Sequence, residues 1–181
     1  MAKQARSLRT HELVLDAAAA EFVRHGYPRA NLQHVAARTG LTKGALYAHF
    51  ASKEKLARAL TDHLDQVVDE LLARHKDADL PANERLRALC CALAERVESD
   101  VRFNAALRLV MDDAQSAPEP PRLPADLRAL SAESLADLAV VILVGAYYTA
   151  PDPERRGLAE RVRGLWDAVD GRQAVEETGA R

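Results

Sequence analysis

Apolar residues recur at every third or fourth position along much of the chain, which is the spacing of one face of an α-helix. β-branched residues are sparse, whereas alanine, leucine, arginine and glutamate dominate. A proline inside a helix costs about 3 kcal/mol, so the prolines mark breaks between helices. They lie at Pro28, at Pro81, in the cluster Pro118, Pro120, Pro121 and Pro124, and at Pro151 and Pro153. The pattern predicts an all-α fold.

The N-terminal third has the pattern of three helices, which we call the head. Gly26 stops the first helix, Asn31 can cap the second, and a turn that contains Gly40 precedes the third. The predicted bounds are 10–25, 32–39 and 43–49. Two short helices joined by a tight glycine-containing turn are the sequence form of a helix-turn-helix.

Behind the head, the same spacing predicts a bundle of longer helices. Four of these helices are predicted over 53–76, 103–114, 134–150 and 154–170. A further helix, after an Asn83 cap, carries the apolar stripe Leu86, Leu89, Cys90, Leu93 and Val97. Residues 175–181 are predicted to form a frayed tail. We therefore predict an N-terminal helix-turn-helix domain over residues 1–52 and a C-terminal helical domain over residues 53–181.

The helix predicted over 134–150 is apolar on every side. Such a helix must be covered all round, and in a small bundle one side can be covered only by a second chain. With the stripe of the last helix, it predicts a homodimer interface. Its residues are Leu138, Val141, Ile142, Leu158, Val162, Leu165 and Trp166. The alternative is that both helices belong to the core of one chain.

The net charge of −2 conceals an asymmetry. Residues 1–60 hold ten basic and four acidic side chains, a charge of +6, whereas the remainder holds 15 and 23, a charge of −8. An electropositive end on an acidic body suggests a polyanionic partner.

The longest apolar run, 138–148, is too short to cross a bilayer, and residues 1–9 lack the apolar run of a secretory signal, so we expect a cytoplasmic protein. We expect the neighbours Cys90 and Cys91 to be reduced.

The stretch from Thr42 to Leu56 carries the candidate chemistry. Thr42 can cap the third helix, and Lys43 on its first turn can reach a guanine in the major groove. Gly44 allows a close backbone approach, and the polar tips of Tyr47 and His49 can donate to phosphates. The predicted DNA-binding residues are Arg6, Arg9, Thr10, Thr42, Lys43, Gly44, Ala45, Tyr47, His49 and Lys53. Singly, Tyr47 could be a surface aromatic, Lys53 a solvated charge and Thr42 a cap without a ligand.

Other classes of protein fit the sequence less well. The six histidines are scattered, and the sequence has no metal-ligand spacing, nucleophile elbow or phosphate loop, so we predict neither an enzyme nor a cofactor. A helical interaction protein that never touches DNA would not explain the charge of the head.

The stretch Thr42-Lys43-Gly44-Ala45-Leu46-Tyr47, with His49-Phe50 and Ser52-Lys53-Glu54-Lys55-Leu56 after it, resembles the DNA-binding signature of the TetR family of repressors. The opening Met1-Ala2-Lys3-Gln4, the pair Gly26-Tyr27 and Leu107-Arg108-Leu109 are similar to its γ-butyrolactone receptor-like branch in actinomycetes. The resemblance implies a dimeric repressor on a palindromic double-stranded DNA operator. It also implies release by a small hydrophobic effector bound in the C-terminal domain, and control of antibiotic or secondary-metabolite genes.

Two features qualify the expected effector site. Candidate pocket walls are Leu71, Leu93, Phe103, Leu107, Val110 and Met111, which could equally be plain core. The branch usually carries a tryptophan in the helix after the proline-rich segment, whereas the only tryptophan here is Trp166. The alternative is therefore a ligand-independent repressor, or one that responds to a foreign antibiotic.

Overall fold

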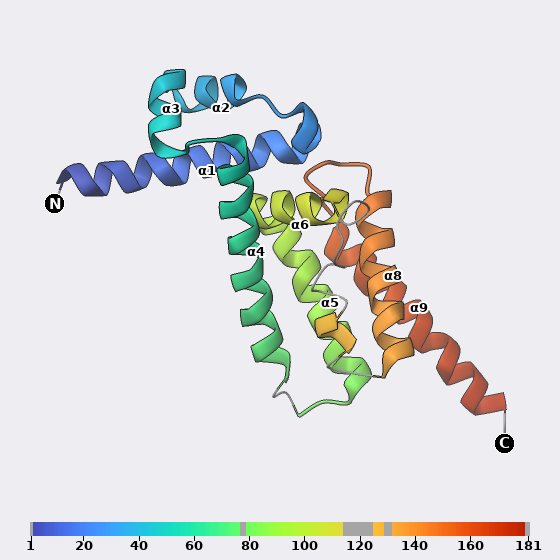
Figure 1. Ribbon diagram of the computed structural model, residues 1–181. Helices are drawn as coiled ribbons and strands as arrows, with labels where there is room; N and C mark the ends of the chain where they lie inside the picture. The colour runs from blue at the N-terminus through green and yellow to red at the C-terminus, as the bar shows by residue number, and fades with distance from the viewer. Residues whose placement is uncertain (1, 77–78, 114–124, 129–131, 180–181) are drawn as a thin grey trace. The chain divides into compact units, whose positions relative to one another are not determined.

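The computed structural model describes residues 2–76, 79–113, 125–128 and 132–179 (Figure 1). These residues are helical with short connections and contain no strand, which confirms the predicted all-α class. The helices are α1 (Ala2–Arg29), α2 (Leu32–Thr39), α3 (Lys43–His49), α4 (Lys53–Lys76), α5 (Ala82–Ser99), α6 (Val101–Asp113), α8 (Glu133–Thr149) and α9 (Leu158–Gly179). None of the helices in these ranges is both long and apolar enough to cross a membrane. The proline cluster over 118–124 lies outside the described residues.

Two compact units divide the chain. Unit 1 comprises residues 1–67 and 100–120, and unit 2 comprises residues 68–99 and 121–181. The predicted boundary after residue 52 separates the helix-turn-helix from the other helices, whereas packing groups α6 and the first part of α4 with the head.

Unit 1 is built around α1, which packs against α2, α3 and α6. Val14, Ala18 and Phe22 lie along the buried face of α1 and are almost inaccessible to solvent. Val35 of α2 and Leu46 of α3 are buried as well. The core of the head is thus made by residues at helical spacing, as the sequence pattern predicts.

Helix α1 is longer than its predicted bounds of 10–25. It begins at Ala2 and is assigned through Arg29, but Gly26 interrupts it with φ 69° and ψ 164°. This region of backbone space is essentially restricted to glycine, so Gly26 ends the first straight segment as expected. The extra N-terminal turns were missed because no capping residue marks their start.

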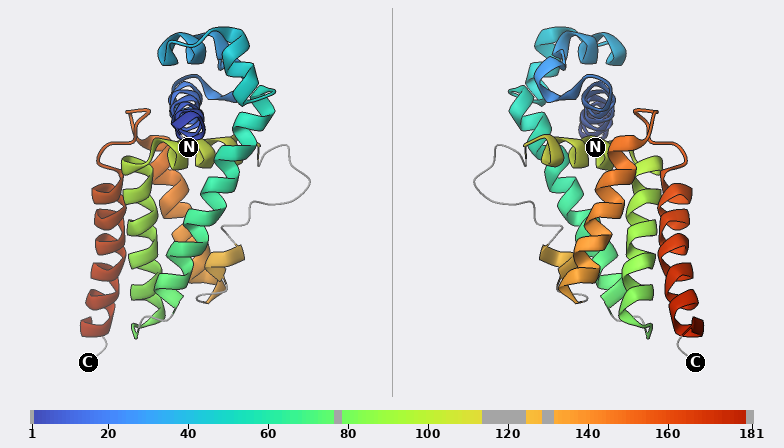
Figure 2. Two further views of the ribbon diagram at one scale, coloured as in Figure 1. Left: turned by 90° about the vertical axis from the view of Figure 1, so that its left-hand side faces the viewer. Right: turned by 90° about the vertical axis from the view of Figure 1, so that its right-hand side faces the viewer.

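Unit 2 contains α5, α8 and α9, which pack on one another and run side by side (Figure 2). The whole predicted stripe of α5 is buried. Three predicted bounds are wrong. Asn83 lies inside the first turn of α5 and does not cap it, and residues 175–179 continue α9 where a frayed tail was expected. Helix α9 also begins later than predicted, after two residues with positive φ, Arg155 and Gly157.

Four of the seven predicted interface residues belong to the core of one chain. Ile142, Leu158, Val162 and Trp166 are each 6% exposed or less without any partner chain. The prediction is wrong for them because apolar periodicity does not distinguish a side chain that packs on its own helices from one that packs on a partner. Leu138 is half-buried, whereas Val141 and Leu165 are 67% and 40% exposed.

The neighbouring cysteines are both free. Cys90 is buried, and this burial raises the pKa of its thiol to about 12. Burial also raises the pKa of the Cys91 thiol, against the charges of Arg163 and Arg87. Because the thiolate is the reactive form, both side chains act as packing residues.

Candidate nucleic-acid interface

Local capping fixes the two short helices of the head. The Asn31 side chain accepts a hydrogen bond from the backbone N–H of Gln33 at 2.8 Å, at the start of α2. Thr42 Oγ1 accepts one from the backbone N–H of Ala45 at 3.2 Å, at the start of α3. Between them Gly40, with φ 68°, ends α2 in the left-handed conformation. The helix-turn-helix thus has the bounds and caps that the sequence predicts.

One face of α3 is anchored and the opposite face is exposed. Leu46 and Phe50 are buried in the head. Lys43 and Gly44 are exposed, and Tyr47 is 41% exposed. No atom outside its own helix lies within 4 Å of the position that a Cβ on Gly44 would take, so the glycine leaves an open approach to the backbone. This is the arrangement that a recognition helix needs.

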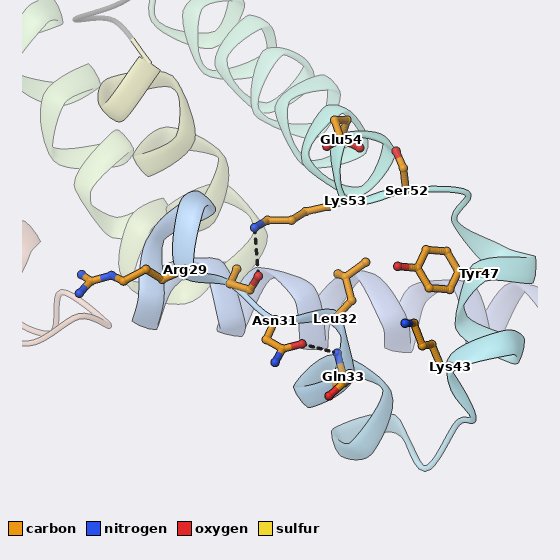
Figure 3. Close-up of a pocket in the computed structure, with 10 residues that line it drawn as sticks. Arg29, Asn31, Leu32, Gln33, Lys43, Tyr47, Ser52, Lys53 and Glu54 are labelled. Carbon is orange, nitrogen blue, oxygen red and sulfur yellow. Dashed lines mark hydrogen bonds between the residues drawn. The ribbon is translucent and has the colours of Figure 1, made fainter.

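The exposed face of α3 borders a hollow of about 550 Å³ in unit 1 (Figure 3). Its lining residues are Arg29, Ala30, Asn31, Leu32, Gln33, Lys43, Tyr47, Ser52, Lys53 and Glu54. Lys43 and Tyr47 lie together, with the ammonium 5.9 Å from the ring centroid. The sequence analysis missed the contribution of Asn31 and Gln33. The capped start of α2 was the signal that could have indicated it, because helix N-termini bind anions.

Lys53, also expected to grip DNA, is engaged inside the head. Its ammonium donates to the carbonyl oxygens of Ala30 at 3.0 Å and Pro28 at 3.3 Å, and it lies 4.6 Å from the centroid of the Tyr27 ring. The Tyr27 hydroxyl in turn donates to Glu54 Oε1 at 3.1 Å. Burial, and then this hydrogen bond, raise the pKa of Tyr27.

The remaining predicted contacts lie on α1 and at the end of α3. Arg6 and Arg9 are exposed on the first turns of α1, one helical turn apart. Thr10 Oγ1 donates to the carbonyl of Arg6 at 3.0 Å. The half-buried ring of His49 lies 6.4 Å from that of His11, so it is less outward-facing than expected.

A buried acid that the sequence analysis did not single out holds the start of α2. Glu21 is 3% exposed, and its Oε1 accepts a hydrogen bond from the backbone N–H of Asn31 at 3.1 Å. The same oxygen lies 3.1 Å from His34 Nδ1. A carboxylate at a helix N-terminus is favoured by the helix dipole. Glu21 therefore ties α2 to α1.

Charged side chains at the start of α6 tie this helix to α1 and α4 within unit 1. Arg102 contacts Asp16 Oδ1 at 2.6 Å and Glu12 Oε2 at 2.5 Å. Asp100 accepts from the backbone N–H groups of Arg102 and Phe103 and lies 2.8 Å from His63 Nε2. Burial opposes ionisation of Asp100, but these hydrogen bonds outweigh it and lower its pKa.

The candidate pocket walls fall in different units. Leu71 and Leu93 are buried in unit 2, whereas the other four lie on α6 in unit 1. On α6, Phe103 is buried and Leu107, Val110 and Met111 are half-buried. The effector pocket stays a prediction.

Comparison with known proteins finds relatives for the head. "Bacterial regulatory proteins, tetR family" matches residues 14–60, which span the capped helix-turn-helix. The A-factor receptor protein of Streptomyces griseus is 48% identical over 69 residues, 38% of the chain. Residues 14–60 thus match the DNA-binding part of the TetR family. The solved structure of an ArpA-like γ-butyrolactone receptor is 26% identical and superposes with a TM-score of 0.61, covering 91% of the chain and 82% of the receptor.

A second relative is the HTH-type transcriptional repressor KstR2 of Mycobacterium tuberculosis, 36% identical over 112 residues, or 60% of the chain. The alignments span 25% of the A-factor receptor and 53% of KstR2. The similarities support the γ-butyrolactone receptor-like branch that the sequence resembles. All three named relatives are regulators or receptors and none is an enzyme. Across the ranges that the structure describes, no three histidine, cysteine or acidic side chains are grouped to hold a metal ion.

Proposed function

We propose that the protein is a transcriptional repressor that binds a palindromic DNA operator as a homodimer. The proposal rests on the two faces of α3. One face is buried through Leu46 and Phe50. The other exposes Lys43, Gly44 and Tyr47 beside a hollow with polar walls. Lys43 is the candidate base reader, since an ammonium can reach guanine O6 and N7. Tyr47 and the capped starts of α2 and α3 are candidate phosphate contacts.

The exposed helical N-terminus of α1 extends this candidate surface. Arg6 and Arg9 are exposed there and are candidate contacts to the phosphate backbone or the minor groove. Together with the net charge of +6 on residues 1–60, they would draw the head to a polyanion. Lys53 is assigned a different role below.

An exposed apolar stripe on α8 supports the dimer. Val141, Val144 and Tyr148 are 67%, 38% and 50% exposed, and they follow helical spacing along one face. Leu165 of α9 is exposed as well. Pairing through these residues would keep Val141 and Leu165 of the predicted interface and leave out its four buried members. A dimer must place its two recognition helices about 34–36 Å apart to enter successive major grooves.

The proposed effector is a small hydrophobic molecule such as a γ-butyrolactone or an antibiotic. The names of the A-factor receptor protein and of the γ-butyrolactone receptor support this class of signal. Its binding would release the operator by favouring a DNA-incompetent state, with a coupling free energy of about 1–3 kcal/mol. The regulated genes are proposed to be those of antibiotic or secondary metabolism.

A second candidate is a repressor without a natural ligand, or one that responds to a foreign antibiotic. The position of the only tryptophan favours it. Trp166 is 1% exposed in the core of unit 2, on α9, rather than in the helix where the receptor branch usually carries a tryptophan.

Footprinting on the promoters of its own and neighbouring genes would locate the operator. Fluorescence anisotropy at one fixed salt concentration would then compare this duplex with a scrambled one, because salt alone changes such affinities strongly. Tighter binding of the operator is expected, and equal affinities would contradict sequence-specific repression. Release of the bound operator by added γ-butyrolactones or antibiotics would separate the two candidates.

A further inference from the structure

We propose that Lys53 is a positioning residue of the head, which holds the start of α4 against the corner between α1 and α2, and that it is not a phosphate contact. The inference rests on the proposed DNA-binding function and refines how the site is built. A lysine at the N-terminus of a helix next to a DNA-binding hollow is otherwise expected to grip the backbone of the duplex.

The surroundings of the ammonium are already matched to its chemistry. An ammonium has three N–H donors, and Lys53 directs two hydrogen bonds to the carbonyl oxygens of Ala30 and Pro28. Its charge also faces the Tyr27 ring at 4.6 Å, a favourable cation–π distance. Pro28 lies in the last turn of α1 and Ala30 directly follows it, where the helix dipole favours a cation. Figure 3 shows the side chain extending across the hollow to this corner.

The segment that Lys53 holds leads directly into α2. Ala30 precedes Asn31, the N-cap of that helix. Lys53 therefore donates to the carbonyl oxygen of the Ala30–Asn31 peptide bond, while Glu21 accepts from the N–H of the same peptide bond. Two opposite charges from α1 and α4 thus hold the same short piece of backbone. The first turn of α2, which lines the hollow with Lys43 and Tyr47, is placed by this arrangement.

A turn of the lysine toward DNA would leave both carbonyls without this donor. The Lys53–Ala30 hydrogen bond is part-buried and the Lys53–Pro28 bond is exposed, so water replaces the first less readily than the second. A new phosphate contact would have to offset that loss together with the cation–π contact. The arrangement consequently favours the engaged conformation over a free phosphate-binding lysine.

Salt dependence distinguishes the two roles. Each phosphate neutralised by a cation contributes about 0.9 to the slope of log affinity against log salt, so two copies in a dimer would contribute about 1.8. Lys53→Gln in the full chain is expected to bind the operator about tenfold more weakly at an unchanged slope. The ratio of operator to scrambled-duplex affinity should also fall, because a displaced α2 disturbs the specific site most. A slope lowered by about 1.8, or an unchanged operator affinity, would overturn the positioning role.

Two further variants keep the result interpretable. Lys76→Gln removes an exposed lysine from the other end of α4 and is expected to match the parent in affinity and slope. Should Lys53→Gln fail to fold by circular dichroism, Tyr27→Leu removes the ring and leaves the ammonium in place. Weaker binding with the parental slope would support positioning, and parental affinity would overturn it. A parent protein that binds no duplex would contradict the proposed DNA-binding function itself. That outcome is distinct from one that contradicts only the positioning role of Lys53.

Discussion

Arg108 of α6 donates a hydrogen bond to the backbone carbonyl of Val23 in the last straight turn of α1. The guanidinium lies so close to Gly26 that a Cβ there would be 3.2 Å from Nη2. Gly26 itself has φ 69° and ψ 164°. Gly26 thus allows both the break in α1 and the close approach of Arg108 from α6. The similarity of Gly26-Tyr27 and Leu107-Arg108-Leu109 to one branch, noted from sequence, involves residues that meet in space.

Gly26→Ala should destabilise the protein. A residue with a side chain pays about 1–3 kcal/mol in this backbone region, and the new methyl group would also press on Arg108. Urea unfolding followed by circular dichroism measures the change. Gly44→Ala is the matched control, since its Cβ would meet open space in a helix and should stabilise by up to about 1 kcal/mol. Equal stabilities of the Gly26→Ala variant and the parent would contradict the strain argument.

Arg102→Met should weaken the attachment of α6 to α1. The substitution keeps an apolar stem but removes the contacts to Glu12 and Asp16, whose carboxylates are partly exposed. We expect a loss of about 1–2 kcal/mol in the free energy of unfolding, measured in urea. Arg163→Met, which removes an exposed pair with Glu95, is the comparison and should cost about 0.5 kcal/mol or less. Similar losses for both variants would show that the Arg102 contacts stabilise the fold no more than an exposed ion pair does.

The Asp100 carboxylate predicts a specific acid sensitivity. Because its folded pKa is lowered, the ionised group contributes stability that is fully present above the unfolded pKa of about 3.9. This contribution is lost as the pH falls through the lower folded value. Asp100→Asn keeps an N-cap acceptor but removes the titration, so its unfolding free energy should fall less steeply than that of the parent below about pH 4. Asp62→Asn, an exposed site on α4, should follow the parent, and parallel curves for Asp100→Asn would refute the prediction.

The parts of the head that depend on local chemistry could be predicted from sequence. Asn31 and Thr42 cap α2 and α3 within three residues of their own position, so both helices have the expected bounds. The contacts of Lys53 inside the head could not be predicted, because its partners lie 23 and 25 residues earlier in the chain. Glu21 was overlooked for a related reason. A charged residue beside Phe22 is expected at the surface until the fold brings the Asn31 amide to it.

The bundle shows a different limit of sequence patterns. Apolar spacing placed α8 and α9 correctly as elements, but it could not tell inward from outward apolar positions on a helix that is apolar all round. Packing against α5 and α9 decides this, since it buries Ile142 and leaves Val141 exposed. Adjacent residues of one helix therefore have opposite roles.

Val141→Glu should yield monomers if α8 forms the proposed dimer surface. The side chain is 67% exposed in one chain, so the charge costs little in the monomer but would be buried without a partner in the dimer. Sedimentation velocity would report the state of association, and unchanged circular dichroism would show that the fold is intact. Ile142→Glu is the contrasting variant, because it places a charge in the core and should unfold the chain. A Val141→Glu protein that remains dimeric would exclude this stripe as the interface.

Lys43→Ala should lower operator affinity and relax sequence preference. If the ammonium reads a guanine, its loss costs about 1–3 kcal/mol on the operator and less on a scrambled duplex. Tyr47→Phe removes only a hydroxyl from the same exposed face and is expected to weaken both duplexes alike, as a phosphate contact does. Anisotropy titrations with the two duplexes at matched salt would compare the variants. Only contacts to base edges carry sequence information. A Lys43→Ala variant weakened equally on both duplexes would therefore assign Lys43 to the DNA backbone. A Tyr47→Phe variant weakened only on the operator would make Tyr47 the base reader.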